Sequence, residues 1–159
     1  EQQLPFLKLA TFLIRPARTN GDKNMSREPG KKKCTLHVCT SCRPAGWPRE
    51  PRDERPGFQL FKELEDRLHA SSLSDSVDLK AAECLSLCPR PCGIAFSSAG
   101  SWTYLFGDQN PNIGVDAIID CISRYLVVTD GLMPRNDRPL SLQSSVLGRV
   151  PPLTQSELS

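Results

Sequence analysis

The stretch that decides the fold is KCTLHVCTSC, residues 33–42. Apolar and polar side chains alternate over its first six residues, which is the pattern of a strand buried on one face. Two thiols, Cys39 and Cys42, follow directly and are separated by two residues. The segment therefore predicts a strand over residues 33–38 that ends at a cysteine pair.

Five further elements are predicted along the chain. A loop rich in Pro and Gly over 43–57 precedes the first helix. An apolar stripe at helical spacing marks each helix, and short β-rich runs mark the strands. The predicted elements are a helix at 58–70, a strand at 76–81, hairpin strands at 93–97 and 101–106, and a helix at 115–127. This β-α-β-β-β-α order predicts an α/β fold with a small mixed sheet, followed by an irregular C-terminal arm.

The order of elements brings a second cysteine pair to the first. A strand–helix–strand connection makes the first two strands parallel, with a right-handed crossover. Cys84 and Cys88 follow the second strand as Cys39 and Cys42 follow the first. Ligands of such folds bind beyond the carboxyl ends of the parallel strands. We therefore expect the four thiols to meet at one edge of the sheet.

Composition limits the remaining possibilities. The chain has 159 residues and seven cysteines, enough for one domain, and the odd cysteine count argues against a fully paired disulfide framework. It contains no apolar run of membrane-spanning length. Residues 1–33 carry eight Lys or Arg and three acids, whereas residues 34–159 carry twelve and fifteen. The basic excess lies outside the predicted domain, so we expect no nucleic-acid partner and no membrane.

The chain divides into three parts. Residues 1–32 are expected to be a disordered or non-native N-terminal extension, because they are basic and polar before the first strand. Met25 opens MSREPGKKK as a protein start does, so residues 1–24 are expected to lie outside the domain. Residues 33–130 form the predicted metal- or cluster-binding domain. Residues 131–159 are expected to be an arm that packs on it.

Four thiolates on two adjacent loops are the donor set of an iron–sulfur cluster or of a structural zinc site. Both loops are rich in proline, which leaves backbone amides free to donate hydrogen bonds to sulfur. Cys39 and Cys42 alone would suit a dithiol oxidoreductase, although such a pair usually opens a helix. Iron, zinc and dithiol chemistry stay open on the residues alone. No phosphate loop, Ser-His-Asp set or carboxylate pair indicates an enzyme.

The other candidates have plainer interpretations. Cys34 and Cys121 share the parity of core positions, whereas Cys92 follows Cys88 by four residues and could replace a ligand. A Cys34–Cys92 bridge is also compatible with the sequence. Some residues could serve the site but are more simply surface or packing residues: His37, Arg43, Arg90, the acids at 53–54 and 63–66, and the alternating Trp102, Tyr104 and Phe106.

The motifs VCTSCRPAG (38–46), CLSLCPRPCGIAF (84–96), SWTYLFGD (101–108) and RVPPL (149–153) together resemble a bacterial family of uncharacterised predicted metal-binding proteins. That family is similar to thioredoxin-like [2Fe-2S] ferredoxins. The resemblance implies a thioredoxin-like fold and a [2Fe-2S] cluster on Cys39, Cys42, Cys84 and Cys88. It also implies electron transfer to a redox partner protein, without enzymatic activity. We further expect a cytoplasmic location, because thiolate ligation suits a reducing compartment, and a homodimer is compatible with the sequence.

Overall fold

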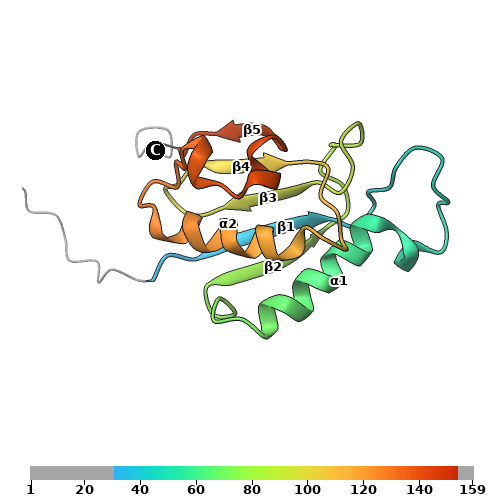
Figure 1. The fold of residues 1–159 in the computed structure, drawn as a ribbon, viewed down its shortest axis with the longest axis horizontal. Helices are drawn as coiled ribbons and strands as arrows, with labels where there is room; N and C mark the ends of the chain where they lie inside the picture. The colour runs from blue at the N-terminus through green and yellow to red at the C-terminus, as the bar shows by residue number, and fades with distance from the viewer. Residues whose placement is uncertain (1–30, 154–159) are drawn as a thin grey trace, which may run out of the picture.

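The computed structural model describes residues 31–153 and places five strands in one mixed sheet (Figure 1). The strands lie in the order β2-β1-β3-β4-β5. β1 and β2 are parallel, with Leu36 opposite Leu79, and every other neighbouring pair is antiparallel. The strand bounds are β1 Cys34–Cys39, β2 Val77–Ala82, β3 Ile94–Ser97, β4 Thr103–Phe106 and β5 Val146–Val150. The predicted parallel pair and the predicted hairpin are both confirmed.

Two long helices form the second layer and lie on the same side of the sheet in Figure 1. They are α1, Pro56–His69, and α2, Val115–Val127. α1 begins two residues earlier than predicted because Pro56 has the backbone geometry of a first helical turn. Three short helical turns complete the chain: η1 Arg52–Glu54, η2 Arg135–Asp137 and α3 Leu140–Gln143. The predicted α/β class is therefore confirmed.

The core lies between the helices and the sheet. Leu60, Leu64 and Leu68 of α1 and Ile118, Ile122 and Tyr125 of α2 face it from the helix side. On the sheet side it contains an aromatic cluster in which the Phe96 and Phe106 ring centroids lie 4.9 Å apart. β1 is buried in this layer, and β2 is held beside it by an unbroken parallel register. The loops that follow them start from rigid anchors.

The C-terminal segment is more regular than predicted. In place of irregular chain throughout, residues 146–150 form β5 and extend the sheet beside β4. The segment before β5 is tied to the core by Tyr104, whose hydroxyl accepts a hydrogen bond of 2.9 Å from the Met133 N–H. Glycine and proline around the strand mask its period, which is why the sequence pattern did not reveal it. The bulge in its pairing, between Leu105 and Phe106, weakens the alternation further.

The start of the described chain belongs to the fold. The Lys32 ammonium donates hydrogen bonds to the carbonyls of Tyr125 and Val128, at 3.1 and 2.6 Å, and so satisfies the C-terminal end of α2. Lys32, the last residue of the expected extension, thus contacts the folded domain. The expectation for residues 1–24 lies outside the described residues. Between residues 31 and 153, no helix has the length and apolar character that crossing a membrane requires.

Candidate metal centre

The two cysteine pairs meet at the carboxyl ends of β1 and β2. Cys39, Cys42, Cys84 and Cys88 all line one open pocket of about 320 Å³. The loops are tied together beside it, because the Thr40 N–H and hydroxyl both donate to the carbonyl of Ala82, at 2.9 and 3.2 Å. The Cys39 Sγ lies 3.9 Å from the carbonyl oxygen of Glu83, the residue before Cys84. Parallel strands thus bring together thiols that are far apart in the sequence.

The first pair is buried and already hydrogen-bonded. Cys39 is 1% exposed and Cys42 is 5% exposed. A hydrogen bond from the Cys42 thiol, helped by backbone N–H groups, lowers the pKa of Cys39 to about 5 against the opposing effect of burial. The same hydrogen bond, together with burial, raises the pKa of Cys42. The pair therefore shares one proton at neutral pH, with the negative charge on Cys39.

Backbone amides surround these two sulfur atoms. N–H groups of Leu85, Ser41 and Cys42 act to lower the pKa of Cys39, and those of Gly93 and Cys92 act to lower the pKa of Cys42. Amides from both loops and from the start of β3 therefore stabilise negative charge at one point. Such N–H donors favour thiolate over thiol and suit a thiolate-ligated metal.

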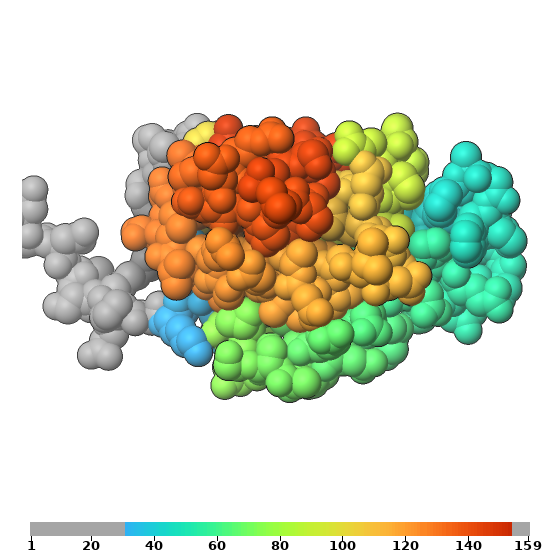
Figure 2. All heavy atoms as spheres, in the orientation of Figure 1, coloured from blue at the N-terminus to red at the C-terminus, as the bar shows by residue number. Residues whose placement is uncertain are grey.

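The amino-terminal end of α1 lies against this pair. The Gly57 N–H donates to the Cys42 carbonyl at 3.0 Å. A Cβ added at Gly57 would stand 2.2 Å from the Cys39 carbonyl oxygen, so only glycine permits this approach. In the sequence, a long loop separates Cys39 and Cys42 from the helix. This argued against dithiol chemistry, in which the cysteine pair usually opens a helix. In the structure, residues 43–55 stand out from the body (Figure 2) and return the chain to the same place.

The second pair is different. Cys84 and Cys88 are exposed thiols on a loop that contains the left-handed residue Ser86, with φ of 57°. The Ser86 N–H lies 3.3 Å from the Cys84 sulfur and donates to it. Among residues 31–153, no three His, Cys, Asp or Glu side chains are close enough together to hold one metal ion. The second pair therefore borders the pocket without closing on the first pair.

Cys92 lies behind the site. It is 4% exposed, its φ is 57°, and its N–H is one of the donors to Cys42. Burial, and then the neighbouring charge of Cys39, raise the pKa of Cys92 to about 11. It does not line the pocket of the four cysteines. Its backbone supports the pair, and its thiol stays protonated.

The two remaining cysteines belong to the core, as predicted. Cys34 and Cys121 are both 0% exposed, and burial raises the pKa of each to about 12. A Cys34–Cys92 bridge is wrong, because both thiols are free and lie at opposite ends of the sheet. Cys34 begins β1, whereas Cys92 precedes β3, whose first residue Ile94 pairs with Val38 near the end of β1.

Of the other candidates, only Arg43 lines the pocket, and its guanidinium donates to the Trp47 carbonyl at 2.9 Å. Arg90 forms an ion pair with Asp108. His37 lies on β1 between Lys80 and Ala95 and does not line the pocket. The aromatic residues at 102–106 are packing residues, since Tyr104 and Phe106 are buried and the Arg149 guanidinium lies over the Trp102 ring. Sequence reasoning missed Gly57 and the Leu85 and Gly93 amides, of which only the Pro-Gly at 56–57 left a signal.

Comparison with known proteins places the chain in a protein family. Residues 36–152 match a family described as a protein of unknown function, DUF1636. The chain belongs to this family. The match covers both cysteine pairs and every strand but the first two residues of β1. No curated protein matched the chain.

Solved structures show the fold of the family. The chain is similar to a thioredoxin-like [2Fe-2S] ferredoxin from Aquifex aeolicus, with a TM-score of 0.51 and 17% identity over 76% of this chain and 96% of that one. Another crystal structure of the wild-type ferredoxin gives a TM-score of 0.47 and 13% identity, over 74% and 98%. The expected thioredoxin-like fold is therefore confirmed.

Proposed function

We propose that this protein is an electron carrier that holds a [2Fe-2S] cluster on Cys39, Cys42, Cys84 and Cys88. The observation that carries the proposal is that four cysteines line one pocket, where backbone amides favour the charged form of the buried pair. The donor set fits the cluster, which takes four thiolates, two on each of its irons. When bound, the cluster would supply reversible one-electron transfer.

The chain's own residues would do three things. Cys39 and Cys42 provide a buried pair that releases its first proton below neutral pH and is ready to bind a cation. The amides of Leu85, Cys92 and Gly93 stabilise the negative charge of the thiolates. The exposed Cys84 and Cys88 would supply the other two thiolates.

The same features support the remaining parts of the proposal. The described residues offer no catalytic set beside the cysteines, so the partner is a redox protein and not a small substrate. The exposed pair puts one side of the pocket within reach of such a partner. Free thiols agree with a reducing, cytoplasmic setting. We propose neither nucleic acid nor membrane as a partner.

One specific observation favours a second candidate. The Cys42-to-Cys39 hydrogen bond, the lowered pKa of Cys39 and the adjacent start of α1 are also what a dithiol oxidoreductase needs. In that chemistry the Cys39 thiolate would attack a partner disulfide, and Cys42 would resolve the mixed disulfide. Cys84 and Cys88 would then have no role. A four-cysteine zinc site is the third candidate and uses the same donors as the cluster.

Purification without oxygen separates the three. We expect a red-brown protein with iron and labile sulfide, and both are lost in Cys39→Ser and Cys84→Ser. The matched control is Cys92→Ser, which removes a buried neighbouring thiol and should keep the colour. A colourless protein with stoichiometric zinc would overturn the cluster in favour of zinc. A metal-free protein that reduces disulfides and needs only Cys39 and Cys42 would support the dithiol candidate.

A further inference from the structure

The edge strand β2 has the geometry of a surface for a second copy of this chain. Among residues 31–153, β2 pairs with β1 on one side and with no strand on the other, because it lies at the edge of the sheet. Ser76 and Ala82 accept hydrogen bonds of 2.9 Å from the N–H groups of Cys34 and Thr40 in the parallel ladder. Backbone direction alternates along a strand, so Asp78 and Lys80 also face β1. The N–H and C=O groups of Val77, Leu79 and Ala81 therefore face outward.

The opposite edge is protected in ways that β2 is not. β5 carries a bulge in its pairing and is followed by Pro151 and Pro152. Bulges and prolines are the usual devices that keep an edge strand from pairing with another chain. β2 is six residues of VDLKAA, without proline and with unbroken register against β1. Its one deterrent is Lys80, and a charged residue deters pairing only when no opposite charge meets it.

Charge along β2 is self-complementary in one register. In an antiparallel pair of two copies centred on Leu79, Asp78 lies opposite Lys80 of the second copy, and Lys80 lies opposite its Asp78. The outward residues Val77, Leu79 and Ala81 then face the second copy's Ala81, Leu79 and Val77, so every free backbone group pairs. Centring on Asp78 or on Lys80 instead would set like charges directly opposite one another, which is unfavourable. Of the registers centred on residues 78, 79 and 80, only the one centred on Leu79 sets opposite charges against each other.

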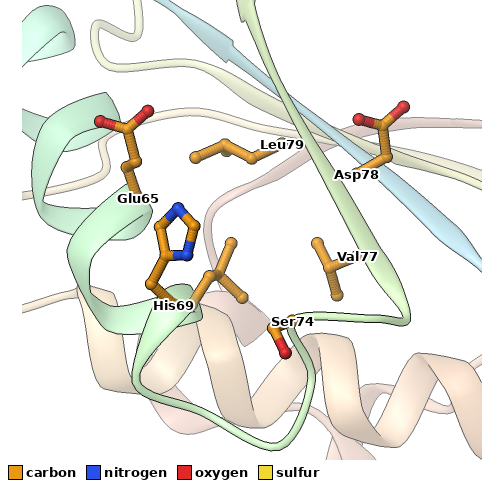
Figure 3. A pocket seen from close by; sticks show the side chains of 7 residues that line it. Glu65, His69, Ser74, Val77, Asp78 and Leu79 are labelled. Carbon is orange, nitrogen blue, oxygen red and sulfur yellow. The ribbon is translucent and has the colours of Figure 1, made fainter.

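The side chains of the strand agree with this register. Leu79 and Val77 point toward α1 and line a groove of about 210 Å³ together with Leu68, His69 and Asp78. The Asp78 carboxylate itself extends from the other side of the strand (Figure 3). Leu79 and Val77 are half-buried, and Ala81 on the same face is exposed. In the centred register, the apolar row of one strand continues into the apolar row of the other. The ionic pairs collect on the opposite face, where Asp78 and Lys80 already lie 3.0 Å apart.

We propose that this protein forms a two-fold symmetric dimer by antiparallel pairing of β2 with β2 of a second copy, in the register centred on Leu79. Such an interface is isologous, since each surface meets its own equivalent. The joined sheet has ten strands, and both pockets of thiols stay outside the interface. Because one strand and one groove bury a small area, the dimer is reversible and depends on protein concentration.

Charge exchange tests the register. The full chain is studied by sedimentation over a range of concentrations, and the unexchanged protein should show a monomer–dimer equilibrium. Asp78→Lys sets lysines opposite one another twice, so its dimer dissociation constant should rise about tenfold or more. Lys80→Asp should act similarly, because it sets aspartates opposite one another. The double exchange D78K/K80D restores both pairs and should return the constant to near its original value.

Two further variants keep the result decisive. Asp53→Lys makes the same charge change on an exposed turn far along the chain and should leave the constant unchanged. Ala81→Pro removes an outward N–H without touching the ladder to β1, so it should weaken the dimer while leaving the thermal unfolding midpoint nearly unchanged. A protein that is monomeric at every concentration would overturn the proposal. So would a dimer whose constant ignores both single exchanges, or a double exchange that fails to restore it.

Discussion

The two cysteine loops differ although each ends a strand of the same parallel pair. The Cys39–Cys42 loop is buried, holds a thiol-to-thiol hydrogen bond and is packed against the start of α1. The thiols of the Cys84–Cys88 loop are exposed, and the Ser86 N–H donates to the Cys84 sulfur at 3.3 Å. The Cys39–Cys42 half of the candidate site is therefore fixed by the fold, whereas the Cys84–Cys88 half lies exposed beside it.

The difference has a functional reading. Under the proposed function, a fixed pair with a lowered proton affinity would be where a metal first binds, since ligand thiols must lose their protons. An exposed pair on a short loop gives access for loading and for contact with a partner. Buried packing on one side and adaptable chain on the other are a general division in binding sites, where rigid elements position and loops adjust. The predictions below test each side of this division.

The largest effect is expected at the contact of α1 with the first loop. In Gly57→Ala the new Cβ meets the Cys39 carbonyl oxygen at 2.2 Å and the Cys42 Cβ at 3.0 Å, so the helix and the loop must separate. Overpacking of this kind costs about 3 kcal/mol of unfolding free energy. Chemical denaturation of the metal-free protein measures it.

Gly148→Ala is the matched control, because a Cβ there meets nothing within 4 Å. It should change the unfolding free energy by less than about 0.5 kcal/mol. Equal losses in the two glycine variants would contradict the close approach of α1 to the cysteine loop.

The next effect separates the two pairs directly. In the metal-free protein, Cys42→Ala removes a buried thiol and its hydrogen bond to Cys39, and should cost about 2 kcal/mol. Cys84→Ala removes an exposed thiol and should cost less than about 0.5 kcal/mol. Both variants should lose the bound metal of the loaded protein. A second loop as sensitive as the first in the metal-free state would contradict the division.

Much of the fold was predictable because its signals are local. The alternation in residues 33–38, the helical stripes and the turn at 98–100 each depend on near neighbours in sequence. The parallel pairing of β1 and β2 followed from the strand–helix–strand connection between them. β5 was missed because Gly148 and the following prolines hide its period, and its place is decided by pairing with distant β4.

The site was predictable only as a set of thiols. Spacing and strand ends placed Cys39, Cys42, Cys84 and Cys88 together, but spacing carries no information on burial. The proximity of Gly57 to Cys39 depends on how residues 43–55 leave and return, which no local pattern encodes. The amides directed at sulfur come from backbone conformation, including the left-handed Cys92.

A third prediction concerns pH in the metal-free protein. The Cys39 thiol titrates at about 5 in the folded chain, against an ordinary value of 9.0, because Cys42 donates a hydrogen bond to its thiolate. Between these values the unfolded chain binds more protons, so the unfolding free energy should rise with pH, by at most about 1.4 kcal/mol per pH unit. Above about 9 the raised pKa values of Cys42 and the core thiols reverse the slope.

Variants at Cys42 check the cause. Cys42→Ser keeps a hydrogen-bond donor and should keep the thiolate absorption of Cys39 at low pH, whereas Cys42→Ala should move its midpoint upward toward 9. Denaturation measured at several pH values should show that the unfolding free energy depends less on pH in Cys42→Ala, and not in Cys42→Ser. Identical titrations of the two variants would assign the low pKa to the backbone amides and not to the thiol pair.

The smallest effect is expected at the outer end of the second loop. Arg90 pairs with Asp108, and both side chains are nearly half exposed, so solvent screens the pair. Arg90→Ala should lower the unfolding free energy by about 0.5 kcal/mol or less, Asp108→Ala should do the same, and the double variant should lose little more. The loop keeps its backbone bonds, from the Arg90 N–H to Leu87 and from the Asp108 N–H to Pro91, at 2.9 and 2.8 Å. A coupling energy between Arg90 and Asp108 far above this value would contradict the division between the loops. It would show that the second loop is held as firmly as the first, because an exposed ion pair on an adaptable loop contributes little free energy.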